Sequence, residues 1–188
     1  GDKVALEPGT TCGQCEFCRS GKYNLCPDVV FWATPPVDGV FQEYVAHEAV
    51  FCHKLPDNMD TMEGALIEPL AIGFHAANRG GAHVGQTAVV FGSGCIGLVS
   101  MMAAKAMGVS KMIVVDVMDK RLDKALELGA DYVINGAKED AVAKILELTG
   151  GKGADLAIET AGTEITTNQA IQAVKKGSTI VLVGYGKT

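Results

Sequence analysis

The 188-residue sequence lacks a long hydrophobic run, a cluster of basic residues and a signal-peptide pattern. Its apolar stretches fall short of the roughly 18 residues that a membrane-spanning helix needs. Acidic residues outnumber basic ones, 22 to 16, which gives a formal net charge of −6. This balance argues against nucleic acid and anionic membranes as partners. We therefore expect a cytoplasmic protein whose partner is a small molecule.

Internal repeats and low-complexity tracts are absent as well. The length allows one well-packed domain, or one domain and part of another. The chain opens on Gly1 without an initiator Met, and residues 4–6 already have a strand pattern. Residues 181–184 resemble the end of a strand with nothing packed after it. We expect both ends to be cut from a longer polypeptide.

Cysteine is scarce, six residues in all, yet four of them fall within fifteen positions. Their spacing is C-x2-C-x2-C-x7-C, formed by Cys12, Cys15, Cys18 and Cys26. Four thiolates in a short loop suit tetrahedral Zn²⁺, and a closed shell of four ligands leaves no position for a substrate. The site would therefore be structural, in place of the apolar core that so small a lobe cannot build. An iron–sulfur cluster and two disulfides are the alternatives. The x7 gap departs from the ferredoxin spacing, and disulfides conflict with a cytosolic setting.

A glycine-rich turn follows the apolar run at residues 88–91. Its glycines have G-x-G-x-x-G spacing and are Gly92, Gly94 and Gly97. In a strand–turn–helix unit, the first two glycines permit a tight turn and the close approach of a pyrophosphate. The third permits close packing of the helix, whose N-terminus attracts phosphate. Because the turn has the right strand and helix patterns around it, the sequence predicts a dinucleotide site.

An acidic residue ends the next apolar run, where a dinucleotide site needs one. Asp116 follows Gly97 by 19 residues. A carboxylate there would accept hydrogen bonds from the adenosine ribose hydroxyls and repel a 2′-phosphate, which favours NAD over NADP. Arg121 begins the following helix, where it either stacks on adenine, pairs with Asp116 or is solvated. Cys95 lies inside the phosphate turn, and we expect no catalytic role for it.

Strand and helix patterns alternate from residue 87 onward. We expect strands at residues 87–91, 112–115, 132–134, 156–159 and 179–183, with helices at residues 96–107, 120–128, 141–148 and 166–174. This alternation predicts an α/β fold, a doubly wound parallel sheet with helices on both faces. We expect the strand order 3-2-1-4-5, with the ligand at the carboxyl ends of the strands, beside the switch point between strands one and four.

The first part of the chain has shorter apolar runs interrupted by Pro and Gly. We expect strands at residues 41–45 and 50–51 in a small, irregular β domain, followed by a helix at residues 61–79 with Thr61 as its N-cap. The domain boundaries that we predict are 1–60 for this small domain, 61–86 for a connecting helical region and 87–188 for the dinucleotide-binding domain.

Glu68-Pro69 interrupts the expected connecting helix. Pro69 removes a helical hydrogen bond and redirects the chain. Glu68 follows an apolar stretch, where an ionised carboxylate is costly unless it is paired or bound to a metal. An exposed helical glutamate is the simpler interpretation from spacing alone. Histidines 47, 53 and 75 are interpreted as packing or surface residues.

These motifs together resemble the zinc-dependent medium-chain dehydrogenases, and within them the polyol (sorbitol/xylitol) dehydrogenase branch. The resemblance spans essentially the whole chain. The residues that carry it, apart from the cysteines and the glycine turn, are 1–4, 7–9, 23–27, 33–36, 54–57, 64–70 and 181–184. The resemblance implies a Rossmann sheet plus part of a small GroES-like β domain with a zinc lobe.

The resemblance also implies roles for individual residues. The four cysteines match the family's structural zinc lobe. Glu68 matches the glutamate at the catalytic zinc, as a ligand or through water. The family positions that touch NAD are matched by Ile96, Asp116, Arg121, Val183, Gly184 and Tyr185, in addition to the glycine turn.

The implied activity is NAD-dependent oxidation of a polyol to a ketose, by hydride transfer at a zinc-polarised alcohol, in a homotetramer. The family's other catalytic-zinc ligands, a Cys and a His-Glu pair, lie upstream of the segment that resembles Gly1, and the C-terminal strands are missing too. We expect this piece to bind structural zinc and, weakly, NAD, but to oxidise no polyol. The alternatives are threonine 3-dehydrogenase or another secondary-alcohol dehydrogenase, and a non-catalytic zinc- and nucleotide-binding module.

Overall fold

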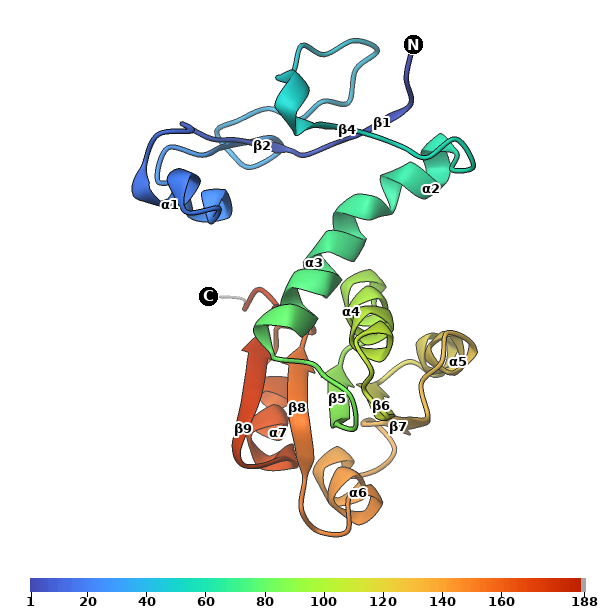
Figure 1. Ribbon diagram of the computed structural model, residues 1–188. Helices are drawn as coiled ribbons and strands as arrows, with labels where there is room; N and C mark the ends of the chain where they lie inside the picture. Colours follow the sequence, from blue (N-terminus) through green and yellow to red (C-terminus); the bar gives the residue numbers. More distant parts are fainter. Residues whose placement is uncertain (187–188) are drawn as a thin grey trace. The chain divides into compact units, whose positions relative to one another are not determined.

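The computed structural model describes residues 1–186 and divides the chain into two compact units, Gly1–Glu68 and Pro69–Thr188 (Figure 1). None of the helices within residues 1–186 has both the length and the apolar character needed to span a bilayer. Each unit is described by itself.

The second unit is built on a five-stranded sheet in which every neighbouring pair is parallel. The strands are β5 (Thr87–Phe91), β6 (Lys111–Asp116), β7 (Tyr132–Asn135), β8 (Ala154–Glu159) and β9 (Val174–Leu182), in the order β7-β6-β5-β8-β9. The doubly wound sheet and the strand order 3-2-1-4-5 that the sequence predicts are therefore confirmed. The switch point lies between β5 and β8, because the chain leaves β5 toward β6 and later returns to its other side.

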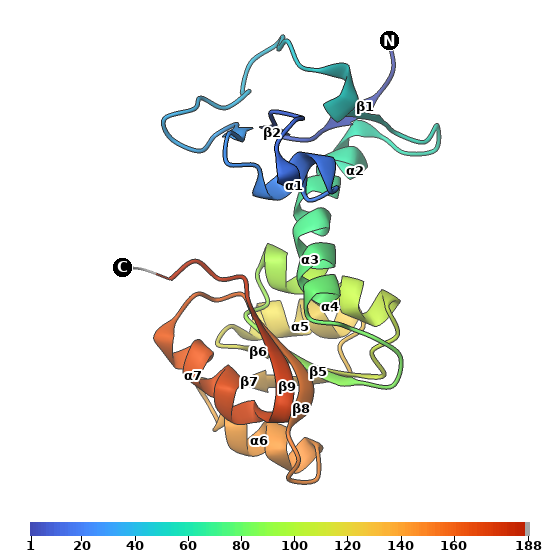
Figure 2. The same ribbon diagram turned by 60° about the vertical axis from the view of Figure 1, so that its left-hand side comes forward.

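Helices cover both faces of this sheet (Figures 1 and 2). They are α3 (Ile67–Arg79), α4 (Cys95–Ala106), α5 (Asp119–Glu127), α6 (Ala141–Leu148) and α7 (Glu164–Ala173). Along β5, Ala88 and Val90 face a core shared with α3, α4 and α5, whereas Val89 and Phe91 face a core shared with α6 and α7. Because β5 is covered on both faces, it is an unbroken apolar run rather than an alternating one.

The first unit contains only short elements. They are β1 (Val4–Leu6), β2 (Gly9–Thr10), α1 (Glu16–Arg19), η1 (Tyr23–Leu25), β3 (Val30–Phe31), η2 (Ala49–Phe51), β4 (Cys52–Lys54) and α2 (Thr61–Ala65). β1 pairs with β4 and β2 pairs with β3, both antiparallel. So few paired strands leave little buried apolar surface in this unit.

Two strand predictions for this unit are wrong. Residues 41–45 form no strand, and Val50 lies in the 3₁₀ helix η2. Phe41 and Tyr44 are almost fully exposed, so the apolar pattern meets neither a core nor a partner strand among the described residues. A strand needs a neighbour for its backbone hydrogen bonds, and apolar residues alone do not supply one.

The predicted helix at residues 61–79 is two helices, α2 and α3, separated at Leu66. Its N-cap is Asp60 and not Thr61, because Asp60 and Glu63 form a capping box with N–H···O distances of 2.7 and 2.9 Å. Pro69 lies in the first turn of α3, where its missing N–H deprives the helix of no bond. The interruption therefore falls three residues before the proline.

Candidate zinc and dinucleotide sites

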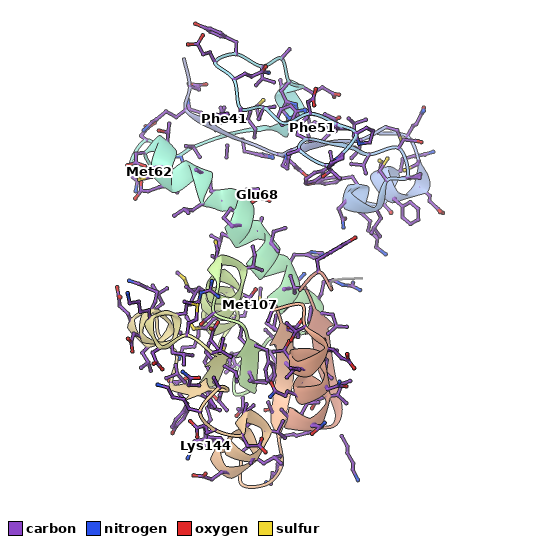
Figure 3. The ribbon with its side chains drawn as sticks, turned by 180° about the vertical axis from the view of Figure 1, so that it is seen from behind. Phe41, Phe51, Met62, Glu68, Met107 and Lys144 are labelled. Carbon is purple, nitrogen blue, oxygen red and sulfur yellow. The ribbon has the colours of Figure 1, made fainter. Side chains whose placement is uncertain are left out.

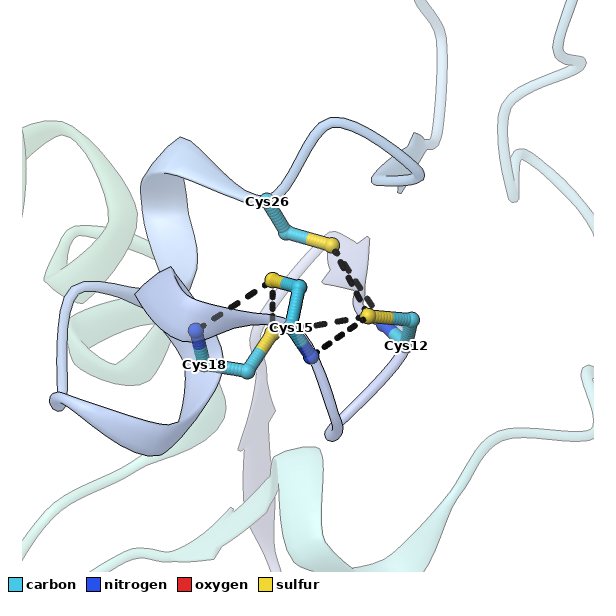
Figure 4. Close-up of side chains that lie close together, drawn as sticks. All are labelled: Cys12, Cys15, Cys18 and Cys26. Atoms are coloured by element: carbon cyan, nitrogen blue, oxygen red, sulfur yellow. Dashed lines mark hydrogen bonds between the residues drawn. The ribbon is translucent and has the colours of Figure 1, made fainter.

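The four clustered cysteines come from one loop and two short helices of the first unit. Cys12 follows β2, Cys15 is the N-cap of α1, Cys18 lies in α1 and Cys26 follows η1. Positive φ angles at Gly13 and Gly21 turn the backbone on either side of α1. These turns point all four side chains inward, as Figure 4 shows.

The sulfur atoms of this cluster are spaced as zinc ligands are. The Sγ–Sγ distances are 3.9 Å between Cys12 and Cys18, 3.4 Å between Cys15 and Cys18, and 3.6 Å between Cys12 and Cys26. Tetrahedral Zn²⁺ with Zn–S bonds of about 2.3 Å requires edges of about 3.8 Å. All six cysteines are free thiols, which disfavours the disulfide alternative. The donor set therefore fits a single tetrahedral zinc.

The thiols of this cluster do not ionise alike. Hydrogen bonds from the backbone N–H groups of Gln14 and Cys15 lower the pKa of Cys12 to about 7. The N–H of Cys18 acts in the same direction on Cys15, but burial and the neighbouring sulfurs outweigh it and raise the pKa of Cys15 to about 11. A cation among the sulfurs would remove this disparity, because thiolate–thiolate repulsion would be neutralised.

The glycine turn joins β5 to α4. Gly92 has a φ of +91°, and a β-carbon on Gly97 would lie 1.9 Å from the carbonyl oxygen of Gly92. A β-carbon on Gly94, in contrast, would meet no atom within 4 Å. Gly94 is the N-cap of α4, and no side chain of this cap accepts the first N–H groups of the twelve-residue helix. The turn fits a pyrophosphate, which these N–H groups and the helix dipole would bind.

Asp116 ends β6 beside this turn and is 8% exposed. One carboxylate oxygen accepts the N–H of Ser93 at 2.7 Å, and the other accepts the N–H groups of Val117 and Met118 at 2.8 and 2.9 Å. Burial acts to raise the pKa of Asp116, but these hydrogen bonds outweigh it and hold the pKa below its usual value. The carboxylate is therefore ionised at neutral pH.

Arg121, in the first turn of α5, lies with its guanidinium 3.9 Å from the Asp116 carboxylate. Of the three interpretations that the sequence allows, the structure shows the pairing with Asp116. The guanidinium is half-exposed, so that it reaches solvent at the same edge of the sheet.

The other predicted cofactor residues lie at this edge too. Ile96 is in the first turn of α4, and Val183, Gly184 and Tyr185 follow β9. Val183 and Gly184 donate their N–H groups to the carbonyl oxygen of Glu159, at 2.8 and 3.0 Å, and Tyr185 is exposed. The structure thus brings all nine predicted cofactor residues to the carboxyl ends of β5, β6 and β9.

Two family models match the chain. The alcohol dehydrogenase GroES-like domain matches residues 1–57, and the zinc-binding dehydrogenase domain matches residues 95–188. The chain belongs to the zinc-binding dehydrogenase family.

The curated relatives of this zinc-binding dehydrogenase chain include sorbitol dehydrogenases. An uncharacterised zinc-type alcohol dehydrogenase-like protein of Escherichia coli (strain K12) is 50% identical over 98% of the chain and 53% of that protein. Sorbitol dehydrogenase of Bacillus subtilis (strain 168) is 45% identical over 98% of the chain and 52% of that protein. The chain therefore spans about half the length of the curated relatives that it matches.

Solved structures of similar proteins cover the whole chain. An oxidoreductase/dehydrogenase of unknown specificity from Escherichia coli has a TM-score of 0.96 and 47% identity, over 100% of this chain and 55% of that one. A zinc-binding dehydrogenase from Sinorhizobium meliloti 1021, solved with NADP, has a TM-score of 0.92 and 30% identity, over 99% of this chain and 55% of that one.

Glu68 of this family member lies in the first turn of α3, exposed to solvent (Figure 3). Within residues 1–186, the cysteine cluster is the only group of three or more potential metal ligands, and Glu68 does not belong to it. The ring of His47 instead lies 4.1 Å from that of Trp32, and His53 lies 3.5 Å from the Glu7 carboxylate. His75 is exposed on α3. The histidines thus have packing and surface positions, as the sequence predicts.

Sequence reasoning missed two polar residues at the dinucleotide edge, Glu159 and Thr160. Glu159 ends β8 as Asp116 ends β6, and it is 1% exposed. The sequence does contain a signal for Glu159, because this acid ends the otherwise apolar strand that we predict at residues 156–159. No spacing motif contains it, which is why it was not singled out.

Proposed function

We propose that the protein oxidises a secondary alcohol of a polyol resembling sorbitol or xylitol to the ketose, with NAD as the hydride acceptor. The observation that carries this proposal is the buried, ionised Asp116 beside an open glycine turn at the switch point of the sheet. The similarity to sorbitol dehydrogenases along 98% of the chain supports the substrate class.

NAD is proposed over NADP because of the charge at Asp116. Its carboxylate lies where the ribose hydroxyls of adenosine would bind, and its lowered pKa keeps a negative charge there that a 2′-phosphate would meet. Arg121, the cation beside it, already pairs with Asp116 and is not free for a phosphate. The Sinorhizobium meliloti relative was solved with NADP, but the cofactor proposed for this chain is argued from its own Asp116.

When bound, NAD supplies the hydride chemistry and catalytic zinc supplies Lewis acidity toward the alcohol. In this chain the N–H groups that begin α4 would bind the pyrophosphate, and Asp116 would accept hydrogen bonds from the ribose. Gly184 and Tyr185 would contact the far part of the cofactor. Glu68 would bind the catalytic zinc directly or through water, and the four cysteines would hold a separate structural zinc.

Domain boundaries, assembly and location belong to the same proposal. We propose a partial GroES-like domain at residues 1–60, a connecting region at 61–86 and an NAD-binding domain at 87–188. The proposed assembly is a homotetramer in the cytoplasm. Neither nucleic acid nor a membrane is proposed as a partner, in keeping with the net charge of −6.

The test has two arms. In the first, a form of the protein with the length of its relatives is given sorbitol, xylitol or threonine with NAD or NADP, and NADH or NADPH absorbance is followed. Faster turnover of a polyol with NAD supports the proposal, and preference for threonine or NADP contradicts it. In the second, the 188-residue chain is assayed alone. We expect no turnover, because Glu68 belongs to no group of three or more potential metal ligands within residues 1–186.

A further inference from the structure

Glu159 is a buried carboxylate with an unusual set of partners. One oxygen, Oε1, accepts hydrogen bonds from the N–H groups of Ala161 and Gly162, at 2.8 and 3.0 Å, and from the hydroxyl of Thr166, at 2.8 Å. No ion pair described for residues 1–186 includes Glu159. Burying a carboxylate without a cation is costly, and these hydrogen bonds offset that cost. Because they come from Ala161, Gly162 and Thr166, they also fix the backbone of the turn after β8.

Glu159 also fixes the segment that follows β9. Its carbonyl oxygen accepts the N–H groups of Val183 and Gly184. A β-carbon on Gly184 would lie 2.2 Å from the nitrogen of Gly162 and 2.7 Å from Oε2 of Glu159. The backbones of Gly162 and Gly184 therefore lie in direct contact beside the Glu159 carboxylate.

The next residue, Thr160, holds the other side of the switch point. Its N–H and its hydroxyl lie 2.8 and 2.9 Å from the carbonyl oxygen of Phe91, at the end of β5. The same hydroxyl lies 3.1 Å from the carbonyl oxygen of Gly92, the first glycine of the turn. Thr160 therefore fixes the turn that faces the pyrophosphate.

We propose that Glu159 and Thr160 are positioning residues for different parts of one dinucleotide, an inference that rests on the proposed function. A dinucleotide lies across the switch point, with its adenosine on the side of β6 and Asp116. Its nicotinamide half then lies over β8 and β9, where Glu159 sets the backbone of Gly162 and Gly184. Glu159 determines the binding of the nicotinamide half, and Thr160 determines the binding of the pyrophosphate.

Two ligands distinguish these roles from a general effect on folding. NADH contains the nicotinamide half, whereas ADP-ribose contains only the adenosine, the pyrophosphate and one further ribose. Binding of each to the 188-residue chain is measured by titration calorimetry. We expect Glu159→Gln to weaken NADH by about fivefold to tenfold, the effect of one lost hydrogen bond, and ADP-ribose by less than about twofold. Thr160→Val should weaken both ligands to the same degree, and Thr160→Ser, which keeps the hydroxyl, should weaken neither.

Two further variants keep the test independent of folding. Gly184→Ala disturbs the same contact from the other side and should reproduce the selective loss of NADH binding. Asp131→Asn is the matched control, because Asp131 accepts the N–H of Met112 at 2.7 Å at the opposite end of β6. This control should lower stability, measured by urea unfolding, without changing the ratio of the two affinities.

The outcomes separate the two proposals. If Glu159→Gln weakens both ligands equally, or neither, the positioning role is wrong although the dinucleotide site stands. If the unmodified chain binds neither ligand, the proposed function falls and this inference with it. A selective loss of NADH binding in both Glu159→Gln and Gly184→Ala supports the inference.

Discussion

The carbonyl oxygen of Gly92 occupies the space that a β-carbon on Gly97 would need, at a separation of 1.9 Å. Gly92 begins the turn that carries β5 into α4, and Gly97 lies in the first turn of that helix. Their contact lets the helix start directly over the end of the strand, with its free N–H groups at the switch point.

We expect Gly97→Ala to lower the free energy of unfolding by about 1–3 kcal/mol, the usual cost of overpacking, and to abolish NADH binding. Gly94→Ala is its control, because the β-carbon at Gly94 meets no protein atom and the backbone there is extended. It should keep the stability and lose only NADH affinity, since the methyl group enters the pyrophosphate position. Urea unfolding and NADH titration check both variants. Equal losses of stability in Gly97→Ala and Gly94→Ala would contradict the separate roles given to the two glycines, helix packing for Gly97 and pyrophosphate binding for Gly94.

We expect one zinc ion per chain, measured by elemental mass spectrometry after a mild chelator wash. Cys15→Ser should remove it, whereas Cys95→Ser, at the exposed start of α4, should retain it. Trp32, the only tryptophan, lies in the first unit and reports its unfolding by fluorescence. Stripping the zinc should change this fluorescence and leave the sheet of the second unit folded by circular dichroism. Retention of zinc in Cys15→Ser would rule out the four-cysteine site.

Asp116→Ser should shift cofactor preference from NADH toward NADPH. The substitution removes the charge that repels a 2′-phosphate. It also removes the partner of Arg121, which lies 3.9 Å from Asp116 in the unsubstituted protein, and so leaves Arg121 free to pair with the 2′-phosphate. Fluorescence titration with each cofactor measures the ratio of affinities. Adding Arg121→Ala to Asp116→Ser should cancel the gain for NADPH. An unchanged ratio in Asp116→Ser would argue against this carboxylate as the source of the preference.

Asp116 also predicts a pH dependence of stability. Its folded-state pKa is lowered below the ordinary value of 3.8. The carboxylate therefore stabilises the fold at all pH values above about 4, and this contribution disappears as the pH falls through the lower folded-state pKa. Asp116→Asn should be less stable at pH 7 by about 1–3 kcal/mol and should approach the parent protein below pH 4. Urea unfolding followed by circular dichroism between pH 7 and pH 3 measures the difference. If the free energies of unfolding of Asp116→Asn and the parent protein differed by the same amount at every pH, the lowered pKa of Asp116 would be contradicted.

The second unit was predictable from sequence because its central strands, β5, β6 and β8, are buried on both faces. Apolar runs such as residues 112–115 stand out from the helical patterns between them, and the right-handed crossover rule then limits the strand order. The first unit was not predictable in the same way. Residues 41–45 have the composition of a strand, but composition does not specify a partner, and Phe41 is fully exposed. Asp60 was missed as an N-cap because Thr61 is an equally good candidate until Glu63 is counted three residues on.

The candidate sites divide along similar lines. The four cysteines and the three glycines have fixed spacings that a sequence displays directly. Glu159 has none, because its partners depend on how the turn after β8 meets the segment after β9. Such a residue becomes visible only when two segments that are distant along the chain are placed side by side.

The hydrogen bond between Thr160 and Phe91 joins residues 69 positions apart, so the nucleotide turn depends on a segment that is distant along the chain. β5 and β6 are made early and can pair while the chain is still short. The glycine turn has no Thr160 to hold it until β8 has been synthesised and has reached the far side of β5. Closing so long a loop is slow relative to local pairing. We therefore expect the nucleotide turn to become rigid only after β8 has paired with β5, because Thr160 follows β8 directly and binds the end of β5.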